Sequence, residues 1–247
     1  MDLREFFETV PRAALGLSGG TDSSYLLWAG RKLGADVRPY FIKTAFQPAF
    51  ELEDAMRICE FAGAELNVIE KDVLAVPCVA DNPENRCHYC KRAIFTTLAQ
   101  RAGQDGYTVI IDGTNASDDV NDRPGMKALN ELSVRSPLRE CGITKDMVRA
   151  LSAEAGLFTA DKPSYACLAT RVPAGEPITE EKLAKVEKAE SALFEMGYTD
   201  FRVRLSGNAA KLQFRRADTM RAVGEWDDIR RAVGKDFSAV ALDLKGR

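Results

Sequence analysis

The sequence predicts an α/β protein: a doubly wound parallel sheet followed by a small C-terminal α+β domain. Short apolar runs alternate with stretches of helical length through the first part of the 247-residue chain, and this alternation is typical of βαβ units. Glycines end several of the helical stretches, as is usual at helix C-termini. From about Val172 the pattern changes to a long helix and two strands around a short turn, which indicates a second domain.

The elements of the first part follow in order along the chain. The apolar run AALGL at 13–17 predicts a buried strand, and the stretch at 23–34 predicts the helix behind it. Further strands are expected at 37–44, 65–72 and 107–114. Further helices are expected at 51–63, 91–103 and 144–156, the last with Thr144 as its N-cap.

The second part begins with the linker VPAGEP, which holds two prolines and a glycine. A long amphipathic helix is expected at 179–197, with acidic residues in its first turn, where they suit the helix dipole. Two strands around a Ser-Gly-Asn turn, a helix near 217–232 and a last strand are expected to complete the chain. We therefore place the domains at 1–172 and 173–247.

Composition and charge narrow the class of protein. Hydrophobic residues make up 45% and charged residues 29%, with a formal net charge of −3, which is ordinary for a globular protein and argues against a nucleic-acid partner. The first residues carry acids early, and no apolar run reaches the roughly 20 residues of a membrane span. We expect a cytoplasmic protein whose six cysteines serve metal binding or chemistry rather than disulfides.

The strongest motif is LGLSGGTDSS at 15–24, between the first strand and the first helix. Glycines allow backbone N–H groups to approach an anion, and the helix N-terminus adds a partial positive charge. The predicted phosphate ligands are Ser18, Gly19, Gly20, Thr21 and Ser23. Asp22 would repel phosphate, so we expect it to hold Mg²⁺. The loop is not a Walker A loop, because no Lys-Ser or Lys-Thr follows the glycines; the alternative is a turn that only caps a helix.

Two further segments fit a nucleotide site because they end predicted strands, where open α/β sheets bind ligands. IDGTNASDD follows the fourth strand and supplies Gly113 and Thr114. FIKTAF ends the second strand and supplies Lys43 and Thr44. For residues 112–115 a plain polar turn is the alternative.

The cysteines fall into two groups. Cys87 and Cys90 form a Cys-x-x-Cys pair around the only histidine, His88, and such a pair serves a zinc site, a redox couple, an iron–sulfur site or two buried thiols. Cys167 lies among small residues close to Arg171, where a cation can stabilise an exposed thiolate, so we expect it to be the nucleophile. The others, which we expect to be inert thiols, are Cys59, Cys78 and Cys141.

SGGTDSS resembles the PP-loop of the ATP pyrophosphatase superfamily, whose adenine nucleotide alpha hydrolase-like fold is a parallel sheet with helices on both faces. Its members cleave ATP between the α and β phosphates and use the AMP half to activate a carbonyl or carboxyl oxygen. Five segments resemble LarE-type enzymes; they come in the same order as in that family and span most of the chain. They are SGGTDSS, DGTNASDDVNDRPGMKAL, RSPLRE, KPSYACLATRVPAG and FRVRL.

The LarE-type resemblance implies an ATP- and Mg²⁺-dependent sulfur transferase in nickel-pincer nucleotide cofactor biosynthesis. It would adenylate the carboxylates of pyridinium-3,5-biscarboxylic acid mononucleotide and convert them to thiocarboxylates with sulfide or another sulfur donor. Some members sacrifice one cysteine and leave dehydroalanine. Others hold a [4Fe–4S] cluster on three cysteines, and the matching positions here are Cys87, Cys90 and Cys167. Three thiolates leave one iron open for an extra sulfide, whereas a closed zinc site needs a fourth ligand.

The resemblance also implies a substrate site and a homo-oligomer. Arg202 and Arg204 are two apart on a predicted strand and so share a face. Their match to the family's arginine-bearing strand implies that they bind the substrate's phosphate, with Arg171 and Glu190 nearby. A solvated strand face is the alternative for the arginine pair. Arg123, Lys127 and Arg135 would meet pyrophosphate or lie in a charged surface loop.

Other functions remain open at this point. A tRNA thiolation enzyme has the same chemistry, but the net charge of −3 and the small second domain argue against it. A zinc-stabilised nucleotide-binding protein would keep the loop without turnover. A ligase that uses ammonia would give the cysteines no role.

Overall fold

The computed structural model describes residues 1–119 and 124–246. The chain forms two compact units. The first unit holds Met1–Val79 and Asn85–Tyr165, and the second holds Ala80–Glu84 and the chain from Ala166 onward. The division into domains at 1–172 and 173–247 stays a prediction.

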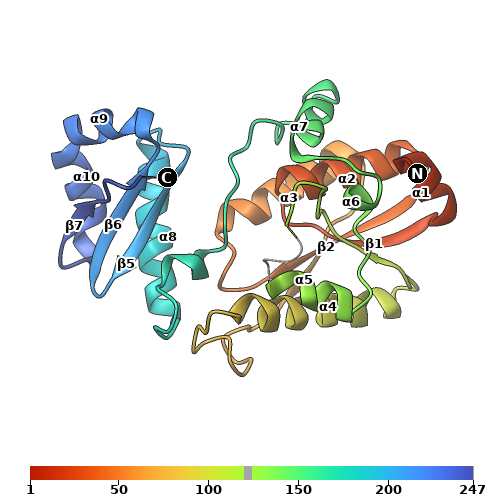
Figure 1. Cartoon of the computed structure of the whole chain (residues 1–247), viewed down its shortest axis with the longest axis horizontal. Helices are drawn as coiled ribbons and strands as arrows, with labels where there is room; N and C mark the ends of the chain where they lie inside the picture. The colour runs from red at the N-terminus through yellow and green to blue at the C-terminus, as the bar shows by residue number, and fades with distance from the viewer. Residues whose placement is uncertain (120–123, 247) are drawn as a thin grey trace. The chain divides into compact units, whose positions relative to one another are not determined.

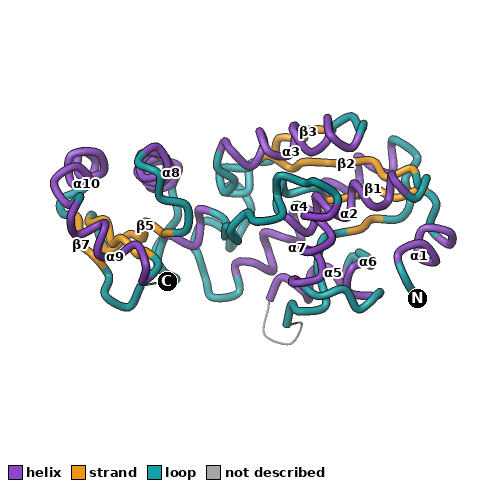
Figure 2. The backbone as a smooth tube through the Cα atoms, turned by 90° about the horizontal axis from the view of Figure 1, so that it is seen from above, coloured by secondary structure: helices purple, strands orange, loops and turns teal. Residues whose placement is uncertain are grey.

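The first unit is built on a parallel sheet of four strands in the order β3-β2-β1-β4 (Figure 1). The strands are β1 Arg12–Gly16, β2 Asp36–Lys43, β3 Asn67–Glu70 and β4 Ile110–Ile111. Leu15 of β1 lies opposite Pro39 on one side and Ile111 on the other, and Figure 2 shows β1 and β2 running side by side. The predicted α/β class and parallel sheet are confirmed.

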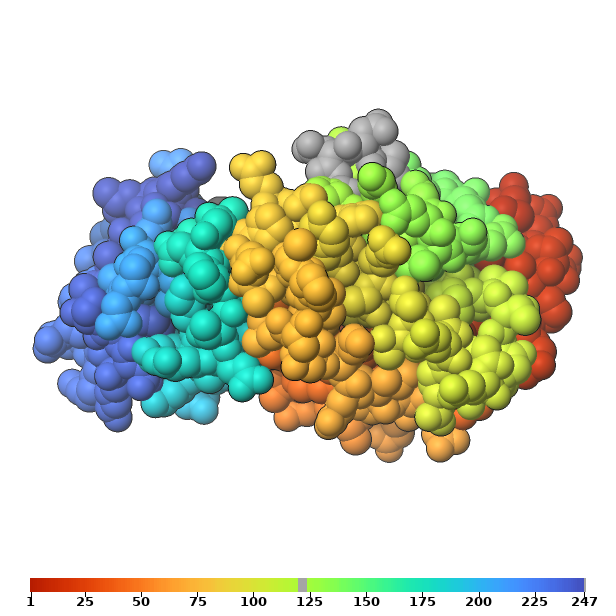
Figure 3. Space-filling view, turned by 90° about the horizontal axis from the view of Figure 1, so that it is seen from below, coloured from red at the N-terminus to blue at the C-terminus, as the bar shows by residue number. Residues whose placement is uncertain are grey.

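Helices cover both faces of this sheet. They are α1 Leu3–Thr9, α2 Thr21–Lys32, α3 Ala49–Ala62, α4 Arg86–Gln104, α5 Pro124–Glu131, α6 Pro137–Glu140 and α7 Lys145–Glu154. One hydrophobic core joins the sheet to the helices that carry Phe6, Leu26 and Ile58. The other core joins it to α4 and α5 through Phe95 and Leu129. Figure 3 shows α4 and the chain before it, in yellow and orange, at the surface of the first unit.

The structure adds three helices that the sequence prediction did not include, α1, α5 and α6, and it changes two of the predicted elements of this unit. The predicted strand at 107–114 is reduced to Ile110–Ile111. It ends at Ile111 because the Asp112 carboxylate accepts hydrogen bonds from the N–H and hydroxyl of Thr114, which form a turn there. The helix predicted at 91–103 begins earlier, at Arg86. No proline or glycine interrupts 86–90, so the helix takes in the Cys-x-x-Cys pair instead of following it.

The second unit holds a three-stranded sheet in the order β5-β6-β7. Its elements are η1 Leu168–Arg171, α8 Glu180–Glu195, β5 Phe201–Ser206, β6 Ala209–Phe214, α9 Arg216–Gly224, α10 Trp226–Val233, η2 Gly234–Asp236 and β7 Val240–Leu242. The hairpin of β5 and β6 was predicted, and Gly207 takes a φ of +57° at its turn. The predicted helix near 217–232 is two helices, because α9 ends at Gly224, a weak helix former, and Glu225 separates it from α10.

No helix among the described residues is both long enough and apolar enough to cross a membrane.

Candidate active site

The glycine-rich loop lies at the carboxyl end of β1 and leads into α2, as predicted. Gly19 has a φ of +69°, and a Cβ there would lie 2.5 Å from the carbonyl oxygen of Glu51. Gly20 is the N-cap of α2 with a φ of −83°, so only Gly19 needs the left-handed conformation. The hydroxyls of Ser18 and Ser23 lie 3.0 Å apart. The start of a helix offers backbone N–H groups to an anion, so this arrangement suits the phosphate site that the sequence predicts.

Asp22 lies in the first turn of α2, and its carboxylate has two partners in the structure. Oδ2 is 2.6 Å from the Nζ of Lys145, and Oδ1 accepts a hydrogen bond of 3.2 Å from the side-chain amide of Asn115. Its side chain is 24% exposed. Oxygen ligands of this kind suit Mg²⁺, so Asp22 fits the metal if Lys145 moves aside.

The turn after β4 packs directly against this loop. A Cβ on Gly113 would lie 2.8 Å from the backbone nitrogen of Ser23. Asp112 is buried and accepts hydrogen bonds of 2.5 Å from the hydroxyl of Thr114 and 2.7 Å from that of Ser136. The structure therefore brings Gly113 and Thr114 to the loop, and it gives Asp112 the role of holding their turn in shape.

Lys43 and Thr44 end β2 at the same edge of the sheet, but both side chains are engaged with Gln47. The Nζ of Lys43 donates to the Gln47 carbonyl at 2.7 Å, and the Thr44 hydroxyl donates to the Gln47 side chain at 2.6 Å. They shape the turn into α3, so any contact with nucleotide requires rearrangement of that turn.

A cavity of about 200 Å³ opens beside the loop, between the sheet and α4. Its walls are largely apolar and include Leu17, Ile42, Ile94 and Phe95, and Ser18 of the loop also lines it. Ligand pockets commonly measure about 300–1,000 Å³, so this smaller cavity suits a base rather than a whole nucleotide. An apolar slot beside an anion site is the arrangement that a purine nucleotide needs.

A segment that the sequence analysis did not assign to the nucleotide site is tied to the loop. Lys162 donates to the Gly19 carbonyl at 2.9 Å and pairs with Asp54. The hydroxyl of Thr21 donates to the Thr159 carbonyl at 2.8 Å. These bonds fix residues 159–162, the chain that leads toward Cys167, onto the first helical turn.

Cys87 and Cys90 lie in the first turns of α4 and are both half-buried. Residues three apart lie on one side of a helix, so the two thiols face the same region. Because α4 leads from the carboxyl end of β3 back to the start of β4, its first turn lies at the carboxyl edge of the sheet, where the loop also lies. The buried guanidinium of Arg86 lies 3.9 Å from the Cys87 sulfur.

The described residues provide only part of the predicted metal site. Among them, no group of three or more His, Cys, Asp or Glu side chains is placed to hold a metal ion. Cys167 belongs to the second unit and Cys87 and Cys90 to the first, so the three-cysteine set stays a prediction. Thiolates in Cys-x-x-Cys spacing are the kind of ligand that an iron–sulfur cluster takes, but two of them are fewer than the three that the predicted cluster needs. The Nε2 of His88 lies 3.6 Å from the carboxylate of Glu131 on α5.

In the second unit, Arg171 and Glu190 form a buried bidentate ion pair. The two N–O distances are 2.6 and 3.1 Å, and the side chains are 0% and 2% exposed. The Glu190 carboxylate also accepts the N–H of Val203 at 2.9 Å. The pair therefore ties η1 to α8 and β5. In this arrangement both side chains have a structural role.

Arg204 lies on an open hollow of about 330 Å³ that Arg171, Ser206 and Lys211 also line. Its guanidinium donates to the Thr170 carbonyl at 2.7 Å. Arg202, two residues before, is buried. Of the predicted substrate arginines, Arg204 is thus the one on a surface open to a ligand.

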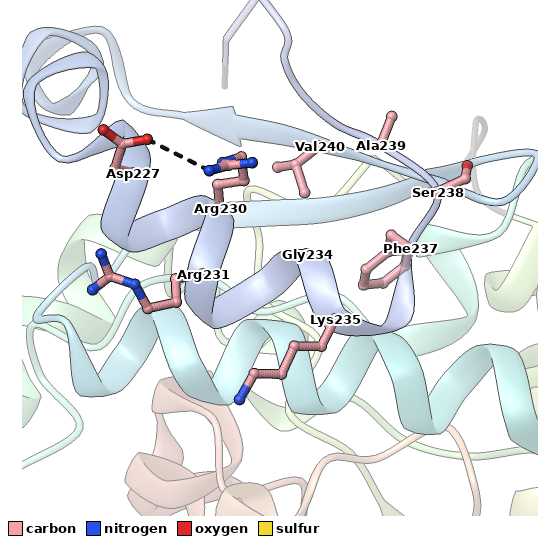
Figure 4. A pocket seen from close by; sticks show the side chains of 9 residues that line it. All are labelled: Asp227, Arg230, Arg231, Gly234, Lys235, Phe237, Ser238, Ala239 and Val240. Carbon is pink, nitrogen blue, oxygen red and sulfur yellow. Dashed lines mark ion pairs between the residues drawn. The ribbon is translucent and has the colours of Figure 1, made fainter.

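A larger hollow of about 610 Å³ lies in the same unit, between α10, η2 and β7 (Figure 4). Arg230, Lys235 and Val240 line it, and Arg230 pairs with Asp227 at 3.9 Å. None of the site residues predicted from the sequence lines this hollow.

Comparisons with known proteins identify the family, although no family model matches the chain. The chain is 30% identical to the pyridinium-3,5-bisthiocarboxylic acid mononucleotide synthase of Lactiplantibacillus plantarum over 242 residues, which covers 95% of this chain and 86% of that protein. The chain belongs to this synthase family. The LarE-type resemblance seen in the motifs is confirmed at that level.

Two other relatives of this LarE-type chain say less about its function. It is 39% identical to an uncharacterized protein of Synechocystis sp. over 86% of this chain and 80% of that one. It is 28% identical to one component of a glutamine-hydrolyzing GMP synthase from Methanococcus vannielii, over 59% of this chain and 50% of that protein. The likeness to the GMP synthase suggests the wider PP-loop family.

The three basic residues that we expected near pyrophosphate lie in different surroundings in this LarE-type chain. Arg123 lies outside the described residues. Lys127 is exposed and pairs with Glu131 along α5. Arg135 pairs with Glu140 and stacks on the Phe6 ring. Two lysines that do lie at the loop, Lys145 and Lys162, were not assigned to it from the sequence, although Lys162 begins the segment KPSYACLATRVPAG.

Proposed function

We propose that this chain is an ATP-dependent sulfur transferase that converts a carboxylate of pyridinium-3,5-biscarboxylic acid mononucleotide into a thiocarboxylate. One observation carries the proposal: in a member of the synthase family, the anion loop and the Cys87–Cys90 pair lie at the same edge of one sheet. Activation with ATP and sulfur chemistry need these two features close together. The chain would work in the cytoplasm, as a homo-oligomer.

The first step would be adenylation. A carboxylate oxygen of the substrate attacks the α-phosphorus of ATP, the bond from that phosphorus to the bridging oxygen breaks, and pyrophosphate leaves with the electron pair. Backbone N–H groups from Ser18 to Ser23 would hold the phosphates, and the apolar cavity would hold adenine. Asp22 would hold Mg²⁺, which would neutralise charge on the leaving pyrophosphate.

The second step would be sulfur transfer. A sulfide attacks the acyl carbon of the adenylate, the carbon–oxygen bond to AMP breaks, and AMP leaves, so no electron acceptor is needed. Cys87, Cys90 and Cys167 would hold a [4Fe–4S] cluster, which when bound would supply a coordinated sulfide as the nucleophile.

The substrate's phosphate would be bound in the second unit. Arg204, on the open hollow, is the residue best exposed for it, and Lys211 lines the same surface. Arg171, Glu190 and Arg202 would support that surface from below, in keeping with their burial. Guanidinium groups suit phosphate and carboxylate because they form paired hydrogen bonds.

Anaerobic purification followed by iron and sulfide analysis tests the cluster. We expect about four irons per chain, lost in Cys87→Ala and Cys90→Ala and kept in Cys59→Ala, a matched control with a buried thiol on α3. A colourless, zinc-loaded protein would contradict the cluster and support the zinc-stabilised alternative.

Incubation with ATP, the biscarboxylate mononucleotide and sulfide tests the reaction. AMP, pyrophosphate and a thiocarboxylate should form together in that mixture. ATP binding without any AMP would point to a nucleotide-binding protein that does not turn over. Copurifying tRNA that becomes thiolated would point to the tRNA enzyme instead.

A further inference from the structure

The hollow of about 610 Å³ between α10, η2 and β7 carries a surplus of positive charge (Figure 4). Among the described residues, three cations line it, Arg230, Arg231 and Lys235, and a single carboxylate, that of Asp227. The whole chain, by contrast, has a formal net charge of −3. Cations in the last turn of a helix also suit the helix dipole, so the charge alone does not indicate a ligand.

The three cations are available to a partner to different degrees. Arg230 lies 3.9 Å from Asp227, and the two side chains are 70% and 84% exposed, so water screens this pair strongly. Arg231 is engaged more closely, at 2.9 Å from Asp228. Lys235 is exposed and forms no ion pair with any described residue. Arg230 and Lys235 therefore offer the positive charge that a ligand can reach.

The strand β7 adds a second, independent feature, because it is an edge strand. Among the described strands it pairs only with β6. The Ala239 carbonyl and the Asp243 N–H bond to β6, and successive residues of such a strand turn their backbone groups to opposite sides. The N–H and C=O groups of Val240 and Leu242 therefore point away from β6, and no hydrogen bond joins them to a described residue. An unpaired edge of this kind is where extended peptides add a strand.

The hollow and the open edge meet at Val240. It lines the hollow, and a Cβ on Gly234 would lie 3.6 Å from its Cγ2 and 3.8 Å from the Cγ of Arg230. The cations of the hollow thus lie on the face of the sheet to which Val240 points. A strand added beside β7 would turn every second side chain to that face, toward the long side chains of Arg230 and Lys235.

We propose that the edge of β7 binds an extended, acidic segment of a partner protein as an additional strand. Main-chain hydrogen bonds to Val240 and Leu242 would supply affinity, and carboxylates on alternate residues would meet Arg230 and Lys235. A second copy of this chain is the poorer occupant, because it would bring the same cations to the edge, and like charges on paired strands repel. This surface does not depend on the ATP and sulfur chemistry of the proposed function.

Calorimetry of the full-length protein with a short synthetic peptide of alternating glutamate and valine tests this surface. We expect saturable binding with a Kd at or below about 1 mM, and slower hydrogen exchange at the amides of Val240 and Leu242. Exposed ion pairs change affinity by about two- to fivefold each. The double variant Arg230→Gln and Lys235→Gln should therefore weaken binding by about four- to 25-fold. The matched control is Arg216→Gln, which removes an exposed cation of α9 that does not line the hollow and should leave binding unchanged.

Two further peptides separate strand addition from simple charge attraction. The same peptide with an N-methyl group on every residue keeps its charges but has no main-chain donors, and it should not bind. A peptide of alternating lysine and valine keeps the donors but reverses the charge, and it should bind more weakly than the acidic peptide.

Several results would overturn the proposal. They are failure of the acidic peptide to bind, equal binding of its N-methylated form, and a loss of affinity in Arg216→Gln as large as in the double variant. Amides of Val240 and Leu242 that are protected in concentrated protein without peptide, and that exchange faster on dilution, would overturn it in favour of a second copy at this edge. Circular dichroism reports whether each variant keeps its fold.

Discussion

Replacing Gly19 by alanine should destroy the anion site for two reasons that a matched control can separate. The left-handed conformation costs a non-glycine residue about 1–2 kcal/mol, and Gly19 has a φ of +69°. The new Cβ would also lie 2.5 Å from the Glu51 carbonyl oxygen, which is closer than the ordinary contact distance of 3.4–4 Å. Forcing atoms together in this way adds about 1–3 kcal/mol, so the free energy of unfolding should fall by about 2–5 kcal/mol.

Gly63→Ala is the control. Gly63 ends α3 with a φ of +63°, and a Cβ there meets nothing within 4 Å, so this variant should lose only the conformational term of about 1–2 kcal/mol. Urea denaturation compares the two variants, and calorimetry with ATP tests the site. Gly19→Ala should lose ATP affinity by at least about tenfold, since a shift of the loop misaligns charged hydrogen bonds, and Gly63→Ala should keep it. Equal stability losses, or full ATP affinity in Gly19→Ala, would refute the reasoning.

Three further predictions concern other parts of the chain. Burial raises the pKa of the Cys59 thiol to about 12, so at pH 9 about one thiol in a thousand is ionised. Cys59 should therefore resist iodoacetamide at pH 9 until the protein is unfolded, and mapping of alkylated peptides checks this. Glu190→Ala should destabilise the protein by about 3–5 kcal/mol because it leaves the buried Arg171 charge unpaired, and Arg171→Met with Glu190→Leu should recover much of that loss in urea denaturation. Arg204→Ala should leave stability within about 0.5 kcal/mol while raising the KM for the mononucleotide about tenfold in the AMP-release assay.

The sequence was most informative where function depends on residues that are close in the chain. The loop at 15–24 combines a strand end, a glycine turn and a helix start, so its structure follows from local rules. Thr144 was predicted as an N-cap by the same kind of rule, and its hydroxyl accepts the N–H of Met147.

The parts that could not be predicted depend on tertiary packing. Lys145 and Lys162 reach the loop across more than one hundred residues of chain, and the residues next to each lysine do not indicate that contact. The start of α4 was missed because the Cys-x-x-Cys spacing was assigned to a loop, although its residues also permit a helix.

The most direct test of the central claim is mass spectrometry of product and protein after turnover with ATP, the biscarboxylate mononucleotide and isotopically labelled sulfide. We expect labelled thiocarboxylate, AMP and pyrophosphate to form in equal amounts, and the mass of the protein to stay unchanged over several turnovers. Unlabelled product with loss of one H₂S at Cys167, which leaves dehydroalanine, would contradict the cluster-borne route.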